Sequence, residues 1–252
     1  DLKSHRLYDD LAYLWPVISP PEEYAEEAGY WGGALRDRLG PGEHRILELG
    51  VGGGPNLSHL TSDFSATAVD ISPQMLALSR KLNPGVQHHL GDMRTVRLGQ
   101  TFDGVLIHDA ISYMLNEGDL RATFATATVH LRRGGVLLVA PDWVREVFKG
   151  TTVLHWVRKK GDVEVAIREY LHDPDPADTE LESIFTYTID ENGYQRVERD
   201  THVMGLFPIT TWTGLMEEAG FEVETLRLPA QDGGYGAFLF VGTLVSPQGA
   251  GS

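Results

Sequence analysis

Short apolar runs alternate with amphipathic stretches between residues 41 and 145 of the chain. Apolar runs bounded by glycine, proline and polar residues predict buried strands, whereas apolar positions at helical spacing predict helices. The predicted strands are 46–49, 66–69, 86–90, 102–109 and 136–140. The predicted helices are 56–60, the segment that Ser72 and Pro73 open, and 117–131. This alternation indicates an α/β fold built on a parallel sheet.

The pattern changes after residue 146, where apolar and polar residues alternate. The stretches 163–170, 182–189 and 194–204 are rich in Thr, Val and Tyr and predict antiparallel strands. Asp190-Glu191-Asn192-Gly193 has the composition of a hairpin turn. We therefore expect residues 146–205 to form an inserted antiparallel β layer that covers the carboxyl edge of the main sheet and shapes a substrate pocket.

The main sheet is expected to resume after this layer. Residues 208–220 predict a helix, for which Thr210 is a plausible N-cap, and 221–228 and 236–244 predict the last two strands. The core is thus expected to comprise residues 41–145 and 206–245. The tail, 246–252, is predicted to be disordered.

Residues 1–40 are expected to form a helical lid over the core. The segment from Pro16 to Pro21 should break this region into two helices. Its aromatic side chains either pack the region onto the core or shield a ligand from water. The candidates for shielding are Tyr8 and Trp31.

Composition excludes several kinds of chemistry. The chain of 252 residues has no cysteine, which excludes disulfides and thiolate catalysis, and no paired His/carboxylate spacing suggests a metal. A formal net charge of −15 argues against broad binding to nucleic acid or to an anionic membrane. No apolar stretch approaches the ~20 residues of a membrane span and no signal peptide opens the chain. The absence of cysteine does not fix the compartment, and the cytoplasm is the default expectation.

The first predicted strand runs into a glycine-rich turn. Gly50, Gly52 and Gly54 stand at alternate positions, where the lack of a Cβ lets the backbone approach a ligand closely. Asp70 ends the next strand, and its carboxylate can accept hydrogen bonds from both hydroxyls of a ribose. The turn departs from the dinucleotide pattern G-x-G-x-x-G, because Pro55 occupies the last glycine position. A nicotinamide-dependent oxidoreductase is therefore only an alternative.

Together with Gly91-Asp92-Met93 after the third strand and the run 133–139 at the fifth, these residues resemble the class I S-adenosylmethionine (SAM)-dependent methyltransferases. The resemblance covers about the first two-thirds of the chain in the family's order. It implies a Rossmann-like, mostly parallel sheet with an antiparallel last strand, SAM as the cofactor and S-adenosylhomocysteine as its product. The cofactor-binding residues that it implies are Tyr8, Glu48, Gly50, Gly52, Gly54, Asp70, Ile71, Met75, Asp92, Met93 and His108.

The resemblance also implies how these residues divide the cofactor among them. Glu48 would favour the ammonium of the methionine part, which the first two glycines of the turn would line. Asp70 would accept from the ribose hydroxyls. Ile71 and Met93 would enclose the adenine ring, and Asp92 would accept from its amino group.

Three further segments, 108–115, 143–148 and 202–207, are similar to small-molecule N-methyltransferases, nearest to those that dimethylate the amine of nucleotide-linked deoxy-aminosugars. In those enzymes a His or Tyr at the place of Tyr113 lies beside the substrate amine, which makes Tyr113 the first candidate for a base or an orienting group. His108 could also take the proton, because histidine titrates near neutrality, and Asp109 could orient either one. The histidines of the inserted layer are expected to be structural: His155, His172 and His202.

The identity of the methyl acceptor stays open. A substrate with a diphosphate needs Arg or Lys nearby, and the loop 231–236 has neither, although Lys149 and residues 158–160 could substitute. The sequence predicts methyl transfer to an amine, or to a hydroxyl, of a small molecule. A protein that keeps the SAM site but lacks catalysis is a second alternative. An exposed edge of the inserted sheet could pair two copies into a homodimer.

Overall fold

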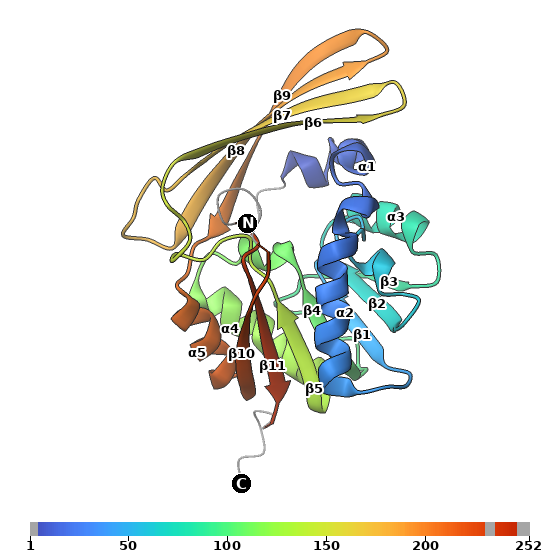
Figure 1. Cartoon of the computed structure of the whole chain (residues 1–252), viewed down its shortest axis with the longest axis vertical. Coiled ribbons are helices and arrows are strands. Elements are labelled where there is room, and N and C mark those ends of the chain that lie inside the picture. Colours follow the sequence, from blue (N-terminus) through green and yellow to red (C-terminus); the bar gives the residue numbers. More distant parts are fainter. Residues whose placement is uncertain (1–4, 230–234, 246–252) are drawn as a thin grey trace.

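Two β-sheets form the frame of the computed structural model, which describes residues 5–229 and 235–245 (Figure 1). The larger sheet has seven strands and the smaller has four. The tail 246–252, predicted to be disordered, lies outside the described residues. No helix in the described ranges combines the length and the apolar character needed to cross a bilayer.

The seven-stranded sheet is mostly parallel, as the sequence predicted. Strands β1 to β5 run parallel to one another, whereas β11 is antiparallel to both β10 and β5. The spatial order is β10-β11-β5-β4-β1-β2-β3. The strands are β1 (Arg45–Leu49), β2 (Ser65–Asp70), β3 (Gln87–Leu90), β4 (Phe102–Ile107), β5 (Leu131–Val139), β10 (Phe221–Arg227) and β11 (Phe238–Leu244).

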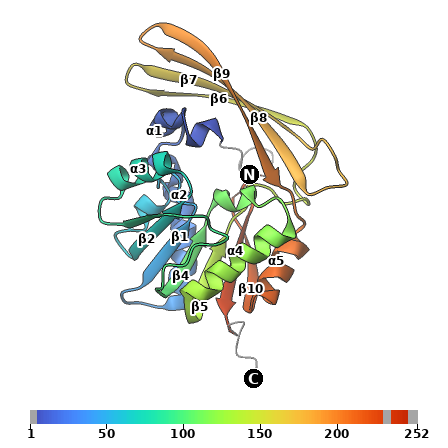
Figure 2. The same cartoon turned by 180° about the vertical axis from the view of Figure 1, so that it is seen from behind.

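Helices cover both faces of this sheet. On one face α2 (Ala25–Leu39) and α3 (Pro73–Leu82) pack, and on the other α4 (Glu117–His130) and α5 (Ile209–Glu218), which are in front in Figure 2. Adjacent residues of β1 point to opposite faces, so Ile46 packs with α2 while Leu47 packs with α4. The two-sided burial explains why the inner parallel strands β1 and β4 are largely apolar.

The inserted layer is the four-stranded sheet, which lies across one end of the molecule in Figures 1 and 2. Its strands pair in chain order and antiparallel: β6 (Thr152–Lys160), β7 (Val163–His172), β8 (Glu180–Glu191) and β9 (Tyr194–Gly205). The predicted hairpin turn closes β8 onto β9 through Asn192 and Gly193, both at positive φ. Sequence reasoning missed β6, although Val153, Trp156 and Val157 have the composition of a strand.

The N-terminal segment lies between the two sheets (Figure 1). It consists of short turns rather than the two regular helices expected: η1 (Arg6–Tyr8), η2 (Ala12–Leu14), α1 (Trp15–Ile18) and η3 (Pro21–Tyr24) lead into α2. Pro16 lies in the first turn of α1 instead of ending a helix, because proline fits the first helical turn. Leu7, Leu14 and Ile18 pack beneath β7 and β8, which fixes the segment against the inserted sheet.

Two helix predictions are corrected by the structure. Residues 56–60 form only the short turn η4 (Leu57–His59) instead of an α-helix. Thr210 does not cap α5, since that helix begins at Ile209 and Pro208 is its N-cap residue. The side chain of Glu146 replaces the expected cap, because its carboxylate accepts a hydrogen bond from Ile209 N at 3.0 Å.

Candidate active site and cofactor pocket

A cavity of about 440 Å³ opens where β1, β2, β3 and β4 end, and the N-terminal segment lines its other side. Ligands of open parallel sheets bind at this edge, and the volume is in the range of small-molecule sites. All of the predicted site residues except Gly54 line it: Tyr8, Glu48, Gly50, Gly52, Asp70, Ile71, Met75, Asp92, Met93, His108, Asp109 and Tyr113.

The glycine turn and Asp70 form one hydrogen-bonded unit. Gly50 and Gly52 have φ of 75° and 56°, a backbone conformation that residues with a Cβ rarely adopt. Gly52 N donates to Asp70 Oδ2 at 2.7 Å, and Ser72 N donates to Asp70 Oδ1 at 2.8 Å. Each carboxylate oxygen thus keeps one further lone pair, so two ribose hydroxyls can still be accepted.

Gly54 lies against α3 and does not line the cavity. A Cβ at this position would overlap Asn83 Nδ2 and Ser79 Oγ, and its φ is 78°. Asn83 Nδ2 also donates to Gly54 O at 3.0 Å. The cofactor role expected for Gly54 is therefore corrected to a packing role that holds the turn close to α3.

We expect Gly54→Ala to destabilise the fold without touching the cavity. Strain at positive φ and overlap with α3 should together lower the free energy of unfolding by about 2–4 kcal/mol. Urea denaturation measures this loss. Gly33→Ala is the matched control, because nothing lies within 4 Å of its Cβ and its exposed helical position tolerates alanine. Equal stabilities of the two variants would contradict the packing role.

The part of the cavity that is expected to hold adenine agrees only in part with the roles implied by the resemblance. Ile71 is 52% exposed at the cavity, which leaves an apolar side chain for a flat ring, and Met93 also lines the cavity. The carboxylate of Asp92, however, is engaged by Arg94, whose backbone N and guanidinium donate to it at 2.7–3.1 Å. Asp92 therefore has fewer free lone pairs than Asp70.

The part of the cavity that is expected to hold the methionine moiety has buried polar atoms without partners in the described structure. Glu48 is 1% exposed, and its Oε2 and the side-chain amide of Asn56 make no hydrogen bond. Burial raises the pKa of Glu48 to about 8, and His108 opposes this rise. A buried carboxyl that lacks a donor fits the ammonium of SAM, so these residues suit the cofactor.

We expect SAM binding to release a proton from Glu48. Below about pH 8 the carboxyl is protonated without the cofactor, and the ammonium favours the ionised form, so affinity should rise with pH by up to ~10-fold per unit. Calorimetric titration in buffers of different ionisation enthalpy counts the proton. Glu48→Gln should abolish the release, and Glu43→Gln, at an exposed site, should preserve it.

His108 is held as a cation. Its Nε2 lies 2.9 Å from Glu27 Oε1, off the ideal hydrogen-bond direction, and its Nδ1 lies 3.1 Å from Asp109 Oδ1. Burial alone would lower the pKa of His108, but the two carboxylates raise it well above 6.5. His108 therefore cannot take the amine's proton at neutral pH, which argues against its expected role as a base.

Asp109 contacts His108 and is itself held in place by its surroundings. Burial opposes its ionisation, but His108 lowers its pKa, and Tyr235 Oη donates to it at 3.2 Å. Burial and the neighbouring Asp109 raise the pKa of Asp142 well above its ordinary value, so Asp142 keeps its proton. Trp31 is fully buried in the core with its ring 5.1 Å from His108, which corrects its expected place as a shield of the cavity.

A second hydrogen-bonded group lies at the side of the cavity beneath the inserted sheet. Tyr113 Oη is 2.6 Å from Tyr8 Oη and 2.7 Å from His202 Nδ1, and His202 Nε2 is 2.8 Å from Asp200 Oδ2. The structure thus brings His202, expected to be structural, into contact with the main catalytic candidate. The sequence does contain a signal for this contact. Asp200 and His202 are polar and stand two positions apart in the predicted strand 194–204, so they share one face of that strand.

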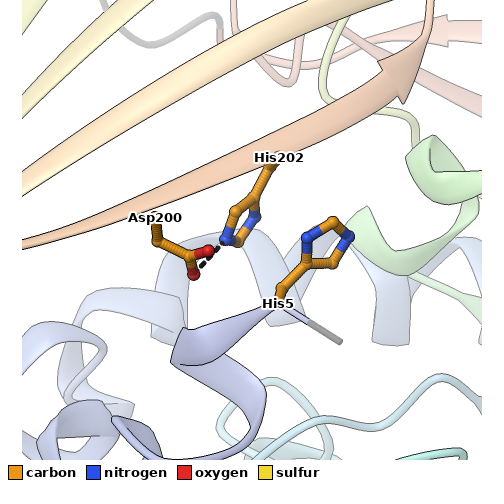
Figure 3. Close-up of side chains that lie close together, drawn as sticks. All are labelled: His5, Asp200 and His202. Carbon is orange, nitrogen blue, oxygen red and sulfur yellow. Dashed lines mark hydrogen bonds and ion pairs between the residues drawn. The ribbon is translucent and has the colours of Figure 1, made fainter. Parts of the chain in front are cut away.

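His5 completes this cluster, and Figure 3 shows His5 beside His202 and Asp200. These three residues offer potential metal ligand atoms within 4.8 Å of one another. Both ring nitrogens of His202 already have partners, however, and the His5 and His202 rings are stacked at 4.3 Å instead of pointing at a common centre. A metal ion would have to displace Tyr113 or Asp200 from His202.

Comparison with known proteins identifies the family. The Methyltransferase domain family model matches residues 46–135. The chain is 31% identical, over 92% of its length and 94% of the relative, to a dTDP-3-amino-3,4,6-trideoxy-alpha-D-glucopyranose N,N-dimethyltransferase of Streptomyces venezuelae. It superposes on DesVI of Streptomyces venezuelae with a TM-score of 0.80 (28% identity, 93% of this chain and 96% of that one).

A further similar structure is SAM-bound CalS10, an amino pentose methyltransferase of Micromonospora echinaspora, with a TM-score of 0.77 (26% identity, 87% of this chain and 91% of that one). The chain belongs to the family of SAM-dependent methyltransferases. It transfers a methyl group from SAM to an amine or hydroxyl of a small molecule. These relatives give no support to an oxidoreductase or to a SAM-binding protein without catalysis.

Proposed function

We propose that the acceptor is the amine of an amino sugar, and that it lies against the Tyr8–Tyr113 hydroxyl pair. The observation that carries this proposal is the placement of two hydrogen-bonded phenol groups on the cavity wall, one of which contacts His202 of the inserted sheet. Tyrosine oxygens can accept from an amine and also donate to it. The similar Streptomyces venezuelae dimethyltransferase, named for an amino-sugar acceptor, supports the same choice.

We also propose a division of labour along the chain. Residues 1–40 close the pocket, residues 41–145 and 206–245 hold SAM, and residues 146–205 cover the acceptor. Within the pocket, Glu48, Gly50 and Gly52 would hold the methionine part and Asp70 the ribose. Ile71, Met75, Asp92 and Met93 would surround the adenine. The cytoplasm, where SAM is made, stays the expected compartment.

The described cavity wall is acidic, which bears on whether the acceptor carries a nucleotide. No Lys or Arg of the described residues lines the cavity. Arg158, a substitute considered for binding a diphosphate, instead pairs with Glu23 at 2.8 Å. Most of the loop 231–236 lies outside the residues that the structure describes. The acceptor is therefore best tested both with and without a diphosphate.

Methyl transfer to two matched acceptors tests the proposal. One is the dTDP-linked amino sugar named for the Streptomyces relative, and the other is the same sugar as a methyl glycoside. With SAM as donor, mass spectrometry should detect methylated amine in at least one reaction and count the methyl groups added. Methylation of neither, with SAM binding intact by calorimetry, would reject the amino-sugar acceptor.

The inserted sheet is the proposed contact of a homodimer, because besides an exposed edge it offers an outer face with apolar side chains. Val153, Val157, Tyr170 and Val197 share that face by strand register and are 37–58% exposed. Apolar patches of this kind often mark interfaces between proteins. Sedimentation of the chain and of Val157→Glu would test the contact.

The net charge of −15 supports the expectation that neither nucleic acid nor an anionic membrane is a partner.

A further inference from the structure

Four side chains form a continuous path away from the cavity. Tyr8 of η1 reaches Tyr113 of η5 (Asp109–Tyr113), which reaches His202 and then Asp200 of β9, through contacts of 2.6, 2.7 and 2.8 Å. Asp200 Oδ2 also accepts from Leu7 N at 2.9 Å, which ties the far end to the N-terminal segment. Tyr8 and Tyr113 line the cavity, whereas Asp200 and His202 are buried behind them.

The chemistry of these groups fixes the direction of each hydrogen bond. Burial opposes ionisation of Asp200, but hydrogen bonds from His202 and from backbone N–H groups lower its pKa, and an ionised carboxylate can only accept. His202 Nε2 must therefore carry a hydrogen, which leaves Nδ1 as the acceptor in the neutral ring. Tyr113 then donates to Nδ1 and accepts from Tyr8. The second lone pair of the Tyr113 oxygen stays available to a donor in the cavity.

Tyr113 is poorly suited to act as the base by itself. Burial, followed by the neighbouring Tyr8, raises its pKa well above 10, so the phenolate is costly. His5, stacked on His202, is no better, since burial and His202 lower its pKa to about 4. A proton that reaches Tyr113 must therefore move on to a group that can hold it.

We propose that His202, supported by Asp200, is the proton acceptor for the substrate amine, reached through Tyr113; this inference rests on the proposed function. An N–H bond of the bound ammonium breaks as an O–H bond forms on Tyr113. The original Tyr113 hydrogen moves to His202 Nδ1, and the imidazolium stays paired with Asp200. The freed amine lone pair then forms the N–C bond to the methyl group of SAM, and the S–C electron pair stays on sulfur.

His202 acts through Tyr113 and is therefore a positioning residue in this scheme. The groups that face it from the packed elements set its charge balance. They are two phenols, one imidazole and two carboxyl groups: Tyr8, Tyr113, His5, Asp200 and Glu169. Burial raises the pKa of Glu169, which accepts from Ser183, so Asp200 is the anion that stabilises the imidazolium.

Nuclear magnetic resonance of the whole chain with isotope-labelled histidine tests the assigned directions of the hydrogen bonds at His202, and it needs no substrate. His202 is assigned by comparison with His202→Asn. The neutral ring of His202 should be the Nε2–H tautomer, and Tyr113→Phe should change the Nδ1 resonance by removing its donor. An Nδ1–H tautomer, or an Nδ1 resonance that ignores Tyr113→Phe, would overturn the relay whatever the acceptor proves to be.

The pH dependence of methyl transfer supplies a second test, with the dTDP-linked amino sugar as acceptor. His202→Asn keeps an acceptor atom for Tyr113 but cannot hold a proton, so transfer near neutral pH should fall about 100-fold. The variant must use amine that is already neutral, so its rate should recover by about 10-fold per pH unit toward alkaline pH. SAM affinity should stay within about twofold.

The outcomes separate this inference from the proposed function. His172→Asn is the matched control, because His172 also pairs with a carboxylate, Glu182, at 3.0 Å but lies outside the cavity lining. It should behave as the wild type. If the wild type transfers no methyl group, the amino-sugar acceptor is refuted. The nuclear magnetic resonance experiment on His202 then still shows whether the relay from Tyr113 to His202 exists. Active wild type with an unchanged pH profile in His202→Asn refutes the relay alone.

Discussion

Asp70→Asn should weaken SAM binding about 100-fold, as measured by calorimetric titration. The carboxylate accepts from Gly52 N and Ser72 N and keeps two lone pairs for ribose hydroxyls. An amide has a single oxygen, so one backbone N–H would face an NH₂ group and lose its partner. Hydrogen bonds to a charged group contribute about 1.5–3 kcal/mol each, so losing one or two accounts for this loss of affinity.

The variant's effect must be separated from general destabilisation. Asp63→Asn changes an exposed acid next to the same sheet and should leave affinity unchanged. Asp70→Glu restores the charge but places it one methylene further out, so it should recover little binding. If Asp70→Asn binds SAM as the wild type does, the joined turn and acid do not hold the ribose.

The sequence predicted most of the large sheet because its determinants are local. Strands buried on both faces require continuous apolar runs, and the glycine turn requires residues that tolerate positive φ, so both are visible as short patterns. Asp70 could be located because chain order places it at the same sheet edge as the turn. The short N-terminal turns were not predicted, because packing beneath β7 and β8 outweighs the helical propensity of that segment.

The protonation states and contacts of the site residues were harder to predict than which residues line the cavity. His108 reads as a possible base in the sequence, but Glu27 and Asp109, distant from each other along the chain, meet at its ring and keep it protonated. The contact between His202 and Tyr113 joins positions 89 residues apart. Only the folded arrangement of the inserted sheet over the core brings such groups together, so no local spacing reveals them.

Tyr113→Phe should lower the rate of methyl transfer at neutral pH about 100-fold and leave SAM affinity unchanged. The ring and its packing are retained, while the hydroxyl between Tyr8 and His202 is lost. Without it the amine has no path to His202, and general base assistance of this kind contributes about 10²–10⁴-fold. Single-turnover rates with saturating SAM measure the effect apart from product release.

Tyr8→Phe and the double variant show whether the two phenols act in series. Tyr8 donates to Tyr113 in the assigned direction, so removing its hydroxyl should slow transfer only several-fold, by a loss of about 1 kcal/mol of hydrogen bonding. The double variant should be no slower than Tyr113→Phe, because the relay is already broken there. Tyr194→Phe, which alters the 69% exposed tyrosine of the β8–β9 hairpin, should match the wild type. Independent, multiplying losses at Tyr8 and Tyr113 would mean that each phenol contacts the amine separately.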